Sequence, residues 1–165
     1  MSIASTLSRN KKEKTMIVTF CGHSDFVPRP GDKEKMVEVL ISVCGDNDVE
    51  FYLGDYGGFD RFVFSCCKEY KKINKGACTV FVSPYLDSGY LSKRVEGYDV
   101  ILYPELENTP YKFRITARNK FMIESSEIVI AYVKRAYGGA YDTFKYAEKK
   151  QKKIFFFDDK TSTVK

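Results

Sequence analysis

The chain has 165 residues, 44% of them hydrophobic and 30% charged, which is typical of one soluble globular domain. No apolar run approaches membrane-spanning length and the polar N-terminus lacks a secretion signal, so we expect a cytoplasmic protein with no membrane partner. The net charge of +5 comes partly from the N-terminal tail and from residues 145–153. Such charge runs are usually solvated surface, and no basic–aromatic interleaving is present, so nucleic acid is disfavoured as a partner.

The cysteines indicate a reducing compartment and no metal centre. Their number is odd, and four of the five lie inside or beside apolar runs, so we expect reduced thiols that mostly belong to the core. Their spacing matches no zinc site, and His23 is the only histidine. The cysteines are Cys21, Cys44, Cys66, Cys67 and Cys78.

Strands and helices are predicted to alternate along the chain. Helical spacing of apolar residues predicts a helix capped by Asp32, a second after Gly57-Gly58, a third over roughly 111–125 and a fourth after Gly138-Gly139. Residues 85–97 form either a short helix or an ordered loop. Apolar runs rich in β-formers predict strands at 16–20, 49–54, 77–84, 98–104, 127–133 and 153–159.

The order of these elements predicts the fold class. Strand alternates with helix, and the apolar runs do not alternate with polar residues, which is typical of a parallel sheet covered on both faces. We therefore expect a single α/β domain over 15–159 with a doubly wound, mostly parallel, Rossmann-like sheet. Residues 1–14 and 160–165 are predicted to be tails.

Glycine turns follow three of the predicted strands. The carboxyl ends of parallel strands share one edge, where ligands bind at the point at which strand order reverses. A single glycine turn is more often just a tight connection, but three on one edge favour a shared pocket in which backbone approaches phosphate closely. None is a GxGxxG fingerprint or a P-loop, which disfavours a standard dehydrogenase or kinase. The residues proposed here to bind ligand are Gly22, His23, Gly54, Asp55, Gly57, Gly58, Gly138, Gly139 and Ala140.

Further polar residues are predicted at the same edge. Arg118 can pair with phosphate and Asn119 with a base or ribose, although Arg118 is as often a surface ion pair. Ser83 ends a strand, and Thr143 lies in the first turn of a helix. His23 either contacts the ligand or anchors the local backbone, and the sequence favours neither.

Carboxylates and tyrosines also flank the turns. No two of the carboxylates have a spacing that identifies acid–base catalysis, and no catalytic residue is assigned. The tyrosines could stack on a base, but such residues more often pack the turn. The residues concerned are Asp55, Asp60, Glu105, Glu107, Asp142, Tyr56, Tyr137 and Tyr141.

The chain resembles the SLOG superfamily of LOG/DprA-like Rossmannoid proteins, and within it the YpsA/YoqJ-like family of bacteria and their phages. The resemblance covers about residues 15–158 and implies binding of a nucleotide or an NAD-derived ligand, with no cofactor required. Because superfamily relatives often dimerise, it also favours a homodimer. The matching stretches are MIVTFCGHSDF, FYLGDYGGFDRF, VFVSPYLDSGY, YDVILYPELE and FRITARNKFMIESSEIVIAYVKRAYGGAYDTFKYA.

The same resemblance raises the question of catalysis. LOG phosphoribohydrolases carry an arginine four residues before a methionine, then a strand and PGGxGTxxE; Arg118, Met122, Gly138, Gly139 and Thr143 match parts of this pattern. Three positions depart from it, because Tyr137 replaces the proline, Asp142 the glycine before the threonine, and Tyr146 the glutamate; one extra residue also separates Gly139 from Thr143. The glutamate expected to help hydrolysis is therefore missing from its place.

Three functions follow, in order of preference. The first is a protein that binds or senses a nucleotide or an NAD-derived ligand, with phosphate at the Gly138-Gly139 turn and Arg118 as counter-charge; the family resemblance adds sequestration of the ligand as one option. The alternative is a LOG-type N-glycoside hydrolase acting on nucleoside monophosphates, with Asp142 or Glu148 as substitute carboxylate. The third, nucleic-acid association, ranks below both.

Overall fold

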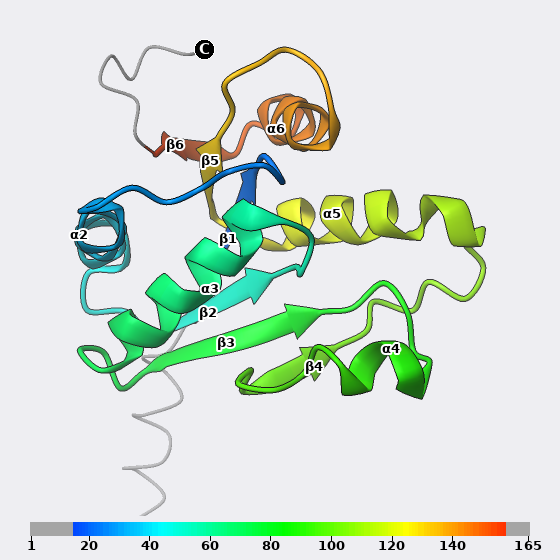
Figure 1. The fold of residues 1–165 in the computed structure, drawn as a ribbon, viewed down its shortest axis with the longest axis horizontal. Helices are drawn as coiled ribbons and strands as arrows, with labels where there is room; N and C mark the ends of the chain where they lie inside the picture. Colours follow the sequence, from blue (N-terminus) through cyan, green and yellow to red (C-terminus); the bar gives the residue numbers. More distant parts are fainter. Residues whose placement is uncertain (1–14, 158–165) are drawn as a thin grey trace, which may run out of the picture.

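The computed structural model describes residues 15–157, so the predicted tails at 1–14 and 160–165 lie outside the described residues (Figure 1). Strands and helices alternate as predicted. The elements are β1 (Met16–Gly22), α2 (Asp32–Cys44), β2 (Val49–Leu53), α3 (Gly58–Lys71), β3 (Ala77–Val82), α4 (Ser88–Ser92), β4 (Val100–Leu102), the 3-10 helix η1 (Tyr111–Phe113), α5 (Arg114–Ser125), β5 (Ile128–Tyr132), α6 (Gly139–Lys149) and β6 (Lys153–Phe156).

The six strands form one parallel sheet in the order β4-β3-β2-β1-β5-β6. The chain runs outward from β1 to β4 and then returns to place β5 on the other side of β1. The strand order therefore reverses between β1 and β5, the position at which open α/β sheets bind ligands. The predicted Rossmann-like α/β fold is confirmed.

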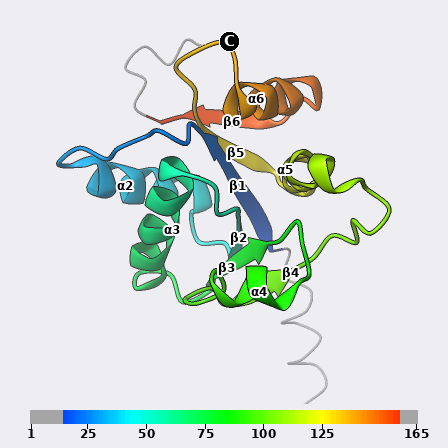
Figure 2. The ribbon, with the colours of Figure 1, turned by 45° about the vertical axis from the view of Figure 1, so that its right-hand side comes forward.

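Helices cover both faces of the sheet (Figure 2). On one face α2 and α3 pack against each other over Val18, Phe51 and Ile130. On the other face α5 and α6 pack together, with Phe144 and its neighbours against Val129. Successive β5 residues thus enter opposite cores, which explains why the apolar runs in the sequence are continuous.

Three local predictions differ from the structure. Strand β4 is shorter than expected, since the ring of Tyr98 stacks on Phe64 and the carboxylate of Asp99 accepts the Thr79 N–H at 2.8 Å. A 3-10 turn precedes α5. Asp32 is the first residue of α2 rather than its cap, and its carboxylate accepts the backbone N–H of Arg29 at 2.9 Å.

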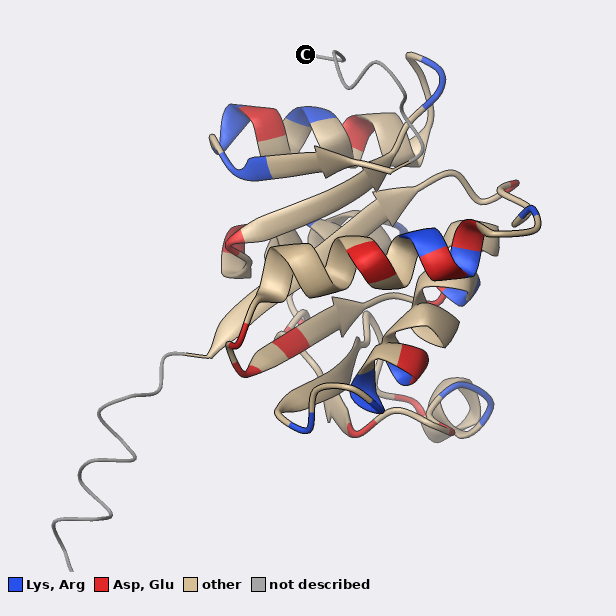
Figure 3. Ribbon diagram, turned by 90° about the vertical axis from the view of Figure 1, so that its left-hand side faces the viewer, with Lys and Arg blue, Asp and Glu red and all other residues tan. Residues whose placement is uncertain are grey.

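The cysteines and surface charges agree with the sequence patterns. All five thiols are free, and four are buried. Lys, Arg, Asp and Glu lie interspersed on the outer faces of α2 and α6 (Figure 3). Between residues 15 and 157, no helix combines the length and the apolar character needed to cross a membrane.

Candidate functional site

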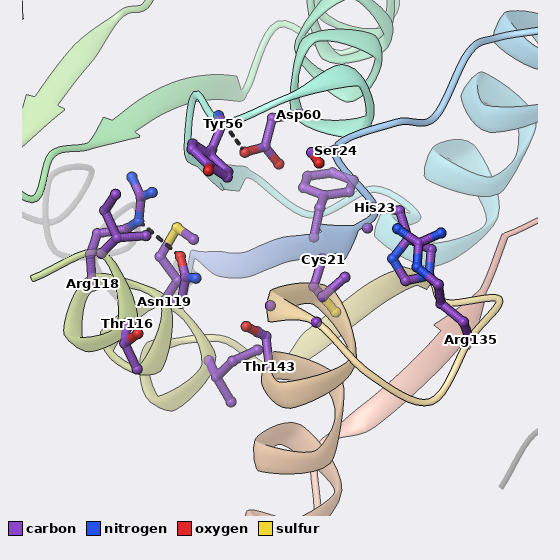
Figure 4. A pocket seen from close by; sticks show the side chains of 18 residues that line it. Cys21, His23, Ser24, Tyr56, Asp60, Thr116, Arg118, Asn119, Arg135 and Thr143 are labelled. Carbon is purple, nitrogen blue, oxygen red and sulfur yellow. Dashed lines mark hydrogen bonds between the residues drawn. The ribbon is translucent and has the colours of Figure 1, made fainter. Parts of the chain in front are cut away.

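A cavity of about 350 Å³ opens at the carboxyl edge of the sheet, over the reversal between β1 and β5 (Figure 4). Its walls come from the end of β1, the beginning of α3, one side of α5 and the turn that opens α6. A volume of this size falls within the range of small-molecule sites. Eight of the residues predicted from the sequence line it: Gly22, His23, Arg118, Asn119, Gly138, Gly139, Ala140 and Thr143.

The Gly138-Gly139 turn is open toward the cavity. Gly138 has φ 94°, a conformation that favours glycine, and a Cβ built on either glycine would meet no atom within 4 Å. The first N–H that bonds back into α6 is that of Asp142, to the Gly138 carbonyl at 2.9 Å. The N–H groups of Gly139, Ala140 and Tyr141 precede that bond, so they are available to an anion.

The Gly57-Gly58 turn is closed by contrast. The N–H of Gly58 donates to the carbonyl of Ser24 at 2.7 Å, and a Cβ on Gly58 would lie 2.0 Å from the carbonyl oxygen of Phe26. A Cβ on Gly57 would lie 2.4 Å from Cβ of Ser24. These two glycines therefore allow two segments of the chain to pack closely and leave no room for a ligand.

Arg118 projects from α5 and is only 2% exposed. Its Nη1 donates to the carbonyl of Val82 at 2.7 Å and its Nε to Oδ1 of Asn119 at 2.9 Å. The guanidinium lies against Gly54, where a Cβ would be 3.1 Å from Cζ. Among residues 15–157 no carboxylate forms an ion pair with it and Nη2 has no hydrogen-bond partner, so a buried cation keeps donors for a ligand.

Asp60 is the single acidic residue among those that line the cavity. Its Oδ2 accepts the backbone N–H of Tyr56 at 2.8 Å. Burial raises the pKa of Asp60 to about 6, opposed by that hydrogen bond and by the charge of Arg118. Burial lowers the pKa of Arg118, and the charge of Asp60 opposes that change. The two groups therefore influence each other, but they form no ion pair.

Asp142 and Glu148, the carboxylates considered as substitutes for the missing glutamate, do not line this cavity. Glu148 pairs with Lys145 at 2.9 Å. Asp142 faces a smaller cavity of about 90 Å³ between α5 and α6, which also contacts Tyr146. The hydroxyl of Tyr146, at the position of the missing glutamate, donates to Glu124.

His23 connects the loops on either side of the strand reversal. Its Nε2 accepts the backbone N–H of Lys134 at 2.8 Å, its ring meets Tyr132 edge-on, and only 3% of the residue is exposed. An acceptor Nε2 carries no proton, so the ring is neutral in this structure. Burial lowers the pKa of His23 below its ordinary value of 6.5, and the charge of Arg135 lowers it further. These contacts match the backbone-anchoring role left open by the sequence.

The state of His23 predicts acid sensitivity. The unfolded chain takes up a proton at this histidine before the folded chain does, so stability should fall as pH drops below 6.5 toward the lower folded pKa. The difference in unfolding free energy between wild type and His23→Gln should change by at most about 1.4 kcal/mol per pH unit. Urea denaturation of both proteins between pH 7.5 and 5 measures it. A difference that does not vary with pH would contradict the assignment.

Five predicted residues do not line the cavity. Gly54 supports the guanidinium of Arg118, and Asp55 pairs with Arg94 at 3.2 Å. Ser83 donates to the carbonyl of Tyr85 at 2.6 Å. Gly57 and Gly58 form the closed turn.

Several lining residues were absent from the predicted set. On α5 the cavity is lined at 115, 116, 118, 119, 122 and 123, a helical stripe that the sequence could have indicated. Arg135 stands at the rim and is 3.4 Å from Asp25. Ser24, Thr116 and Arg135 were not considered from the sequence, whereas Tyr56 and Asp60 were named only as residues that flank the turns.

No protein-family model matches the sequence, and no curated protein matches it. Solved structures do share the fold. DNA processing protein A from Helicobacter pylori is 20% identical with a TM-score of 0.60 over 86% of this chain and 64% of that one. The protein of the same name from Streptococcus pneumoniae is 18% identical with a TM-score of 0.60, over 86% of this chain and 50% of that one. The molybdenum cofactor carrier protein from Chlamydomonas reinhardtii is 17% identical with a TM-score of 0.56, over 87% and 76%.

One prediction about partners is wrong. The sequence disfavoured nucleic acid as a partner of this chain. The Helicobacter pylori protein, which shares the fold, nevertheless binds single-stranded DNA. The prediction relied on finding basic and aromatic residues interleaved within one segment. A parallel sheet gathers binding groups from loops that are far apart in the sequence, so a missing local pattern does not exclude this class of partner.

These identities are low and establish the fold alone, and the chain spans only 64% and 50% of the two DNA processing proteins. Membership of the YpsA/YoqJ-like family stays a prediction. The comparisons show that this chain has a Rossmann-like fold in common with DNA processing protein A and the molybdenum cofactor carrier protein.

Proposed function

We propose that the cavity binds a nucleotide or an NAD-derived ligand, with a phosphate group on the N–H groups that open α6. The observation that carries this proposal is Arg118, a buried guanidinium with unused donors that faces the same cavity as the open Gly138-Gly139 turn. Unused donors on a buried cation are costly, and a ligand that accepts hydrogen bonds from them would offset that cost. The dipole of α6 adds positive potential at the Gly138-Gly139 turn, where Thr143 offers a hydroxyl.

We further propose binding without turnover. N-glycoside hydrolysis of the LOG type needs a carboxylate at the scissile bond, and both substitutes considered from the sequence lie outside this cavity. The carboxylate that does line the cavity, Asp60, already accepts the backbone N–H of Tyr56 at 2.8 Å. The expected result is that nucleoside monophosphates and NAD remain intact after long incubation, as measured by chromatography of the released base. Steady release of base that exceeds one equivalent per protein would instead establish the hydrolase alternative.

The binding proposal is tested on Arg118. In calorimetric titrations we expect at least one nucleoside monophosphate, NAD or ADP-ribose to bind the wild-type chain. Arg118→Gln removes a charged donor and should weaken that affinity roughly 10- to 100-fold, because hydrogen bonds to charged groups contribute about 1.5–3 kcal/mol. Arg61→Gln is the matched control, since Arg61 is an exposed arginine of α3 outside the cavity.

Two outcomes would overturn the proposal. One is that no nucleotide binds. The other is that Arg118→Gln binds as tightly as Arg61→Gln while remaining folded in denaturation experiments.

A single-stranded oligonucleotide should be titrated in parallel. If the oligonucleotide binds and competes with the nucleotide, the N–H groups at the start of α6 also bind nucleic-acid phosphate. Binding without competition would show that DNA binds at another surface.

A further inference from the structure

Two groups of ligand-binding atoms lie at opposite ends of the cavity. Arg118 lies against Gly54 at the end of β2 and bonds to Val82 at the end of β3. The open N-terminus of α6 follows β5, and β1 separates β2 from β5. Helix α6 packs over β1 and β5, whereas the guanidinium reaches the ends of β2 and β3, so the two groups lie over different strands of the sheet. In Figure 4 the guanidinium of Arg118 extends away from Thr143 in the first turn of α6. A ligand that contacts both groups therefore extends along the cavity, from the start of α6 toward the ends of β2 and β3.

The atoms near Arg118 form a donor–acceptor pair. Nη2 of Arg118 is an unused donor, and Oδ1 of Asp60 is an acceptor with no hydrogen bond among residues 15–157. Both side chains face the cavity without pairing to each other. A second phosphate would suit Arg118, but the neighbouring carboxylate of Asp60 would repel it. The pair instead suits a neutral group that presents an acceptor and an N–H donor side by side.

The edge of a nucleobase has this chemistry, since purines and pyrimidines display carbonyl or ring-nitrogen acceptors beside N–H donors. Tyr56 lies at the same end of the cavity and is 63% exposed, so its ring is available for stacking. Ribose hydroxyls also accept and donate, but in a nucleotide they lie only a few bonds from the phosphate. The separation of the two ends therefore favours the base.

We propose that Tyr56, Asp60 and Arg118 form a nucleobase subsite, with the phosphate held at the opposite end by the start of α6. This inference rests on the proposed function and changes the role of Arg118, which reads the base rather than neutralising the phosphate. The ligand is then a nucleotide extended across the reversal between β1 and β5, with its base over β2.

The test compares nucleotides with a ligand that lacks the base. Calorimetric titrations use the four nucleoside monophosphates and ribose 5-phosphate. We expect wild type to bind at least one nucleotide tenfold or more tightly than ribose 5-phosphate. Asp60→Asn should weaken that nucleotide about tenfold and leave ribose 5-phosphate within twofold of wild type. Asp46→Asn is the matched control, because Asp46 is exposed and lies outside the cavity.

A second variant, Tyr56→Ala, keeps the proposal testable if Asp60→Asn does not fold. Tyr56→Ala removes an exposed ring but keeps the backbone N–H that holds Asp60, and it should also weaken nucleotides selectively. Nucleotides and ribose 5-phosphate that bind equally well would overturn the base subsite while leaving phosphate binding intact. A tenfold preference for ribose over 2′-deoxyribose that disappears in Asp60→Asn would also overturn it, because Asp60 would then read the sugar. Failure of every ligand to bind wild type would reject the proposed function itself.

Discussion

Gly139→Ala is expected to abolish nucleotide binding while leaving the fold at least as stable as wild type. A Cβ at this position meets no protein atom within 4 Å, and Gly139 is the first residue of α6, outside the glycines with positive φ. Alanine at such a site typically adds about 0.4–1 kcal/mol of stability by restricting the unfolded chain. The new methyl group would occupy the space in which a phosphate approaches the free N–H groups. Loss of two charge-assisted hydrogen bonds, at about 1.5–3 kcal/mol each, corresponds to more than roughly a hundredfold in affinity.

Thermal denaturation and calorimetric titration of the same preparation separate these two effects. Gly138→Ala is the informative comparison, because its φ of 94° makes alanine strained, so this variant should lose both stability and binding. If Gly139→Ala binds nucleotide as wild type does, the phosphate does not lie at the start of α6.

Gly58→Ala is expected to have the opposite profile, with a large loss of stability. Its Cβ would lie 2.0 Å from the carbonyl oxygen of Phe26, a backbone atom that cannot swing aside. The turn would have to open and break the hydrogen bond from the Gly58 N–H to the Ser24 carbonyl. We expect a destabilisation of about 3 kcal/mol or more, since overpacking of this severity exceeds the usual range. For a chain of this size that lowers Tm by roughly 6–12 °C.

Gly89→Ala is the control for this experiment. Gly89 lies in α4, and a Cβ there would come no closer than 4.0 Å to its nearest neighbour, Oδ2 of Asp87. Its Tm should remain within about 2 °C of wild type, as is usual for surface substitutions. A wild-type Tm for Gly58→Ala would show that the loops after β1 and β2 do not pack as closely as described.

The fold was largely predictable because its signals are local. Continuous apolar runs separated by helical patterns predicted six strands, and their alternation with helices predicted a parallel sheet. The exceptions are residues that contact side chains or backbone far away in the sequence. Asp99 was expected within a strand, but its carboxylate accepts the Thr79 N–H, and Tyr98 is held by Phe64. Such contacts leave no periodic trace in the sequence.

The site was predictable in part. The sequence indicated that glycine turns, Arg118 and Thr143 would gather at one edge, and the parallel sheet brings eight of the thirteen predicted residues to one cavity. It could not distinguish the turns from one another, because their sequences are similar. It also assigned no ligand-binding role to Asp60, because a carboxylate in the first turn of a helix is typical of an ordinary surface residue.

The sequence by itself determined the α/β architecture, the position of each glycine turn and the absence of a glutamate three residues after Thr143, because these depend on residue type and spacing. Only the tertiary structure decided which turn is open. Gly58 is closed by the Ser24 and Phe26 carbonyls from a loop more than 30 residues away, whereas nothing packs on Gly139. Burial of Arg118 between α5 and the ends of β2 and β3, beside Asp60, likewise arises from long-range packing. Secondary-structure propensities act over a few residues. The charge environment of Arg118 and Asp60 and the access to each glycine turn depend instead on which segments the fold brings together.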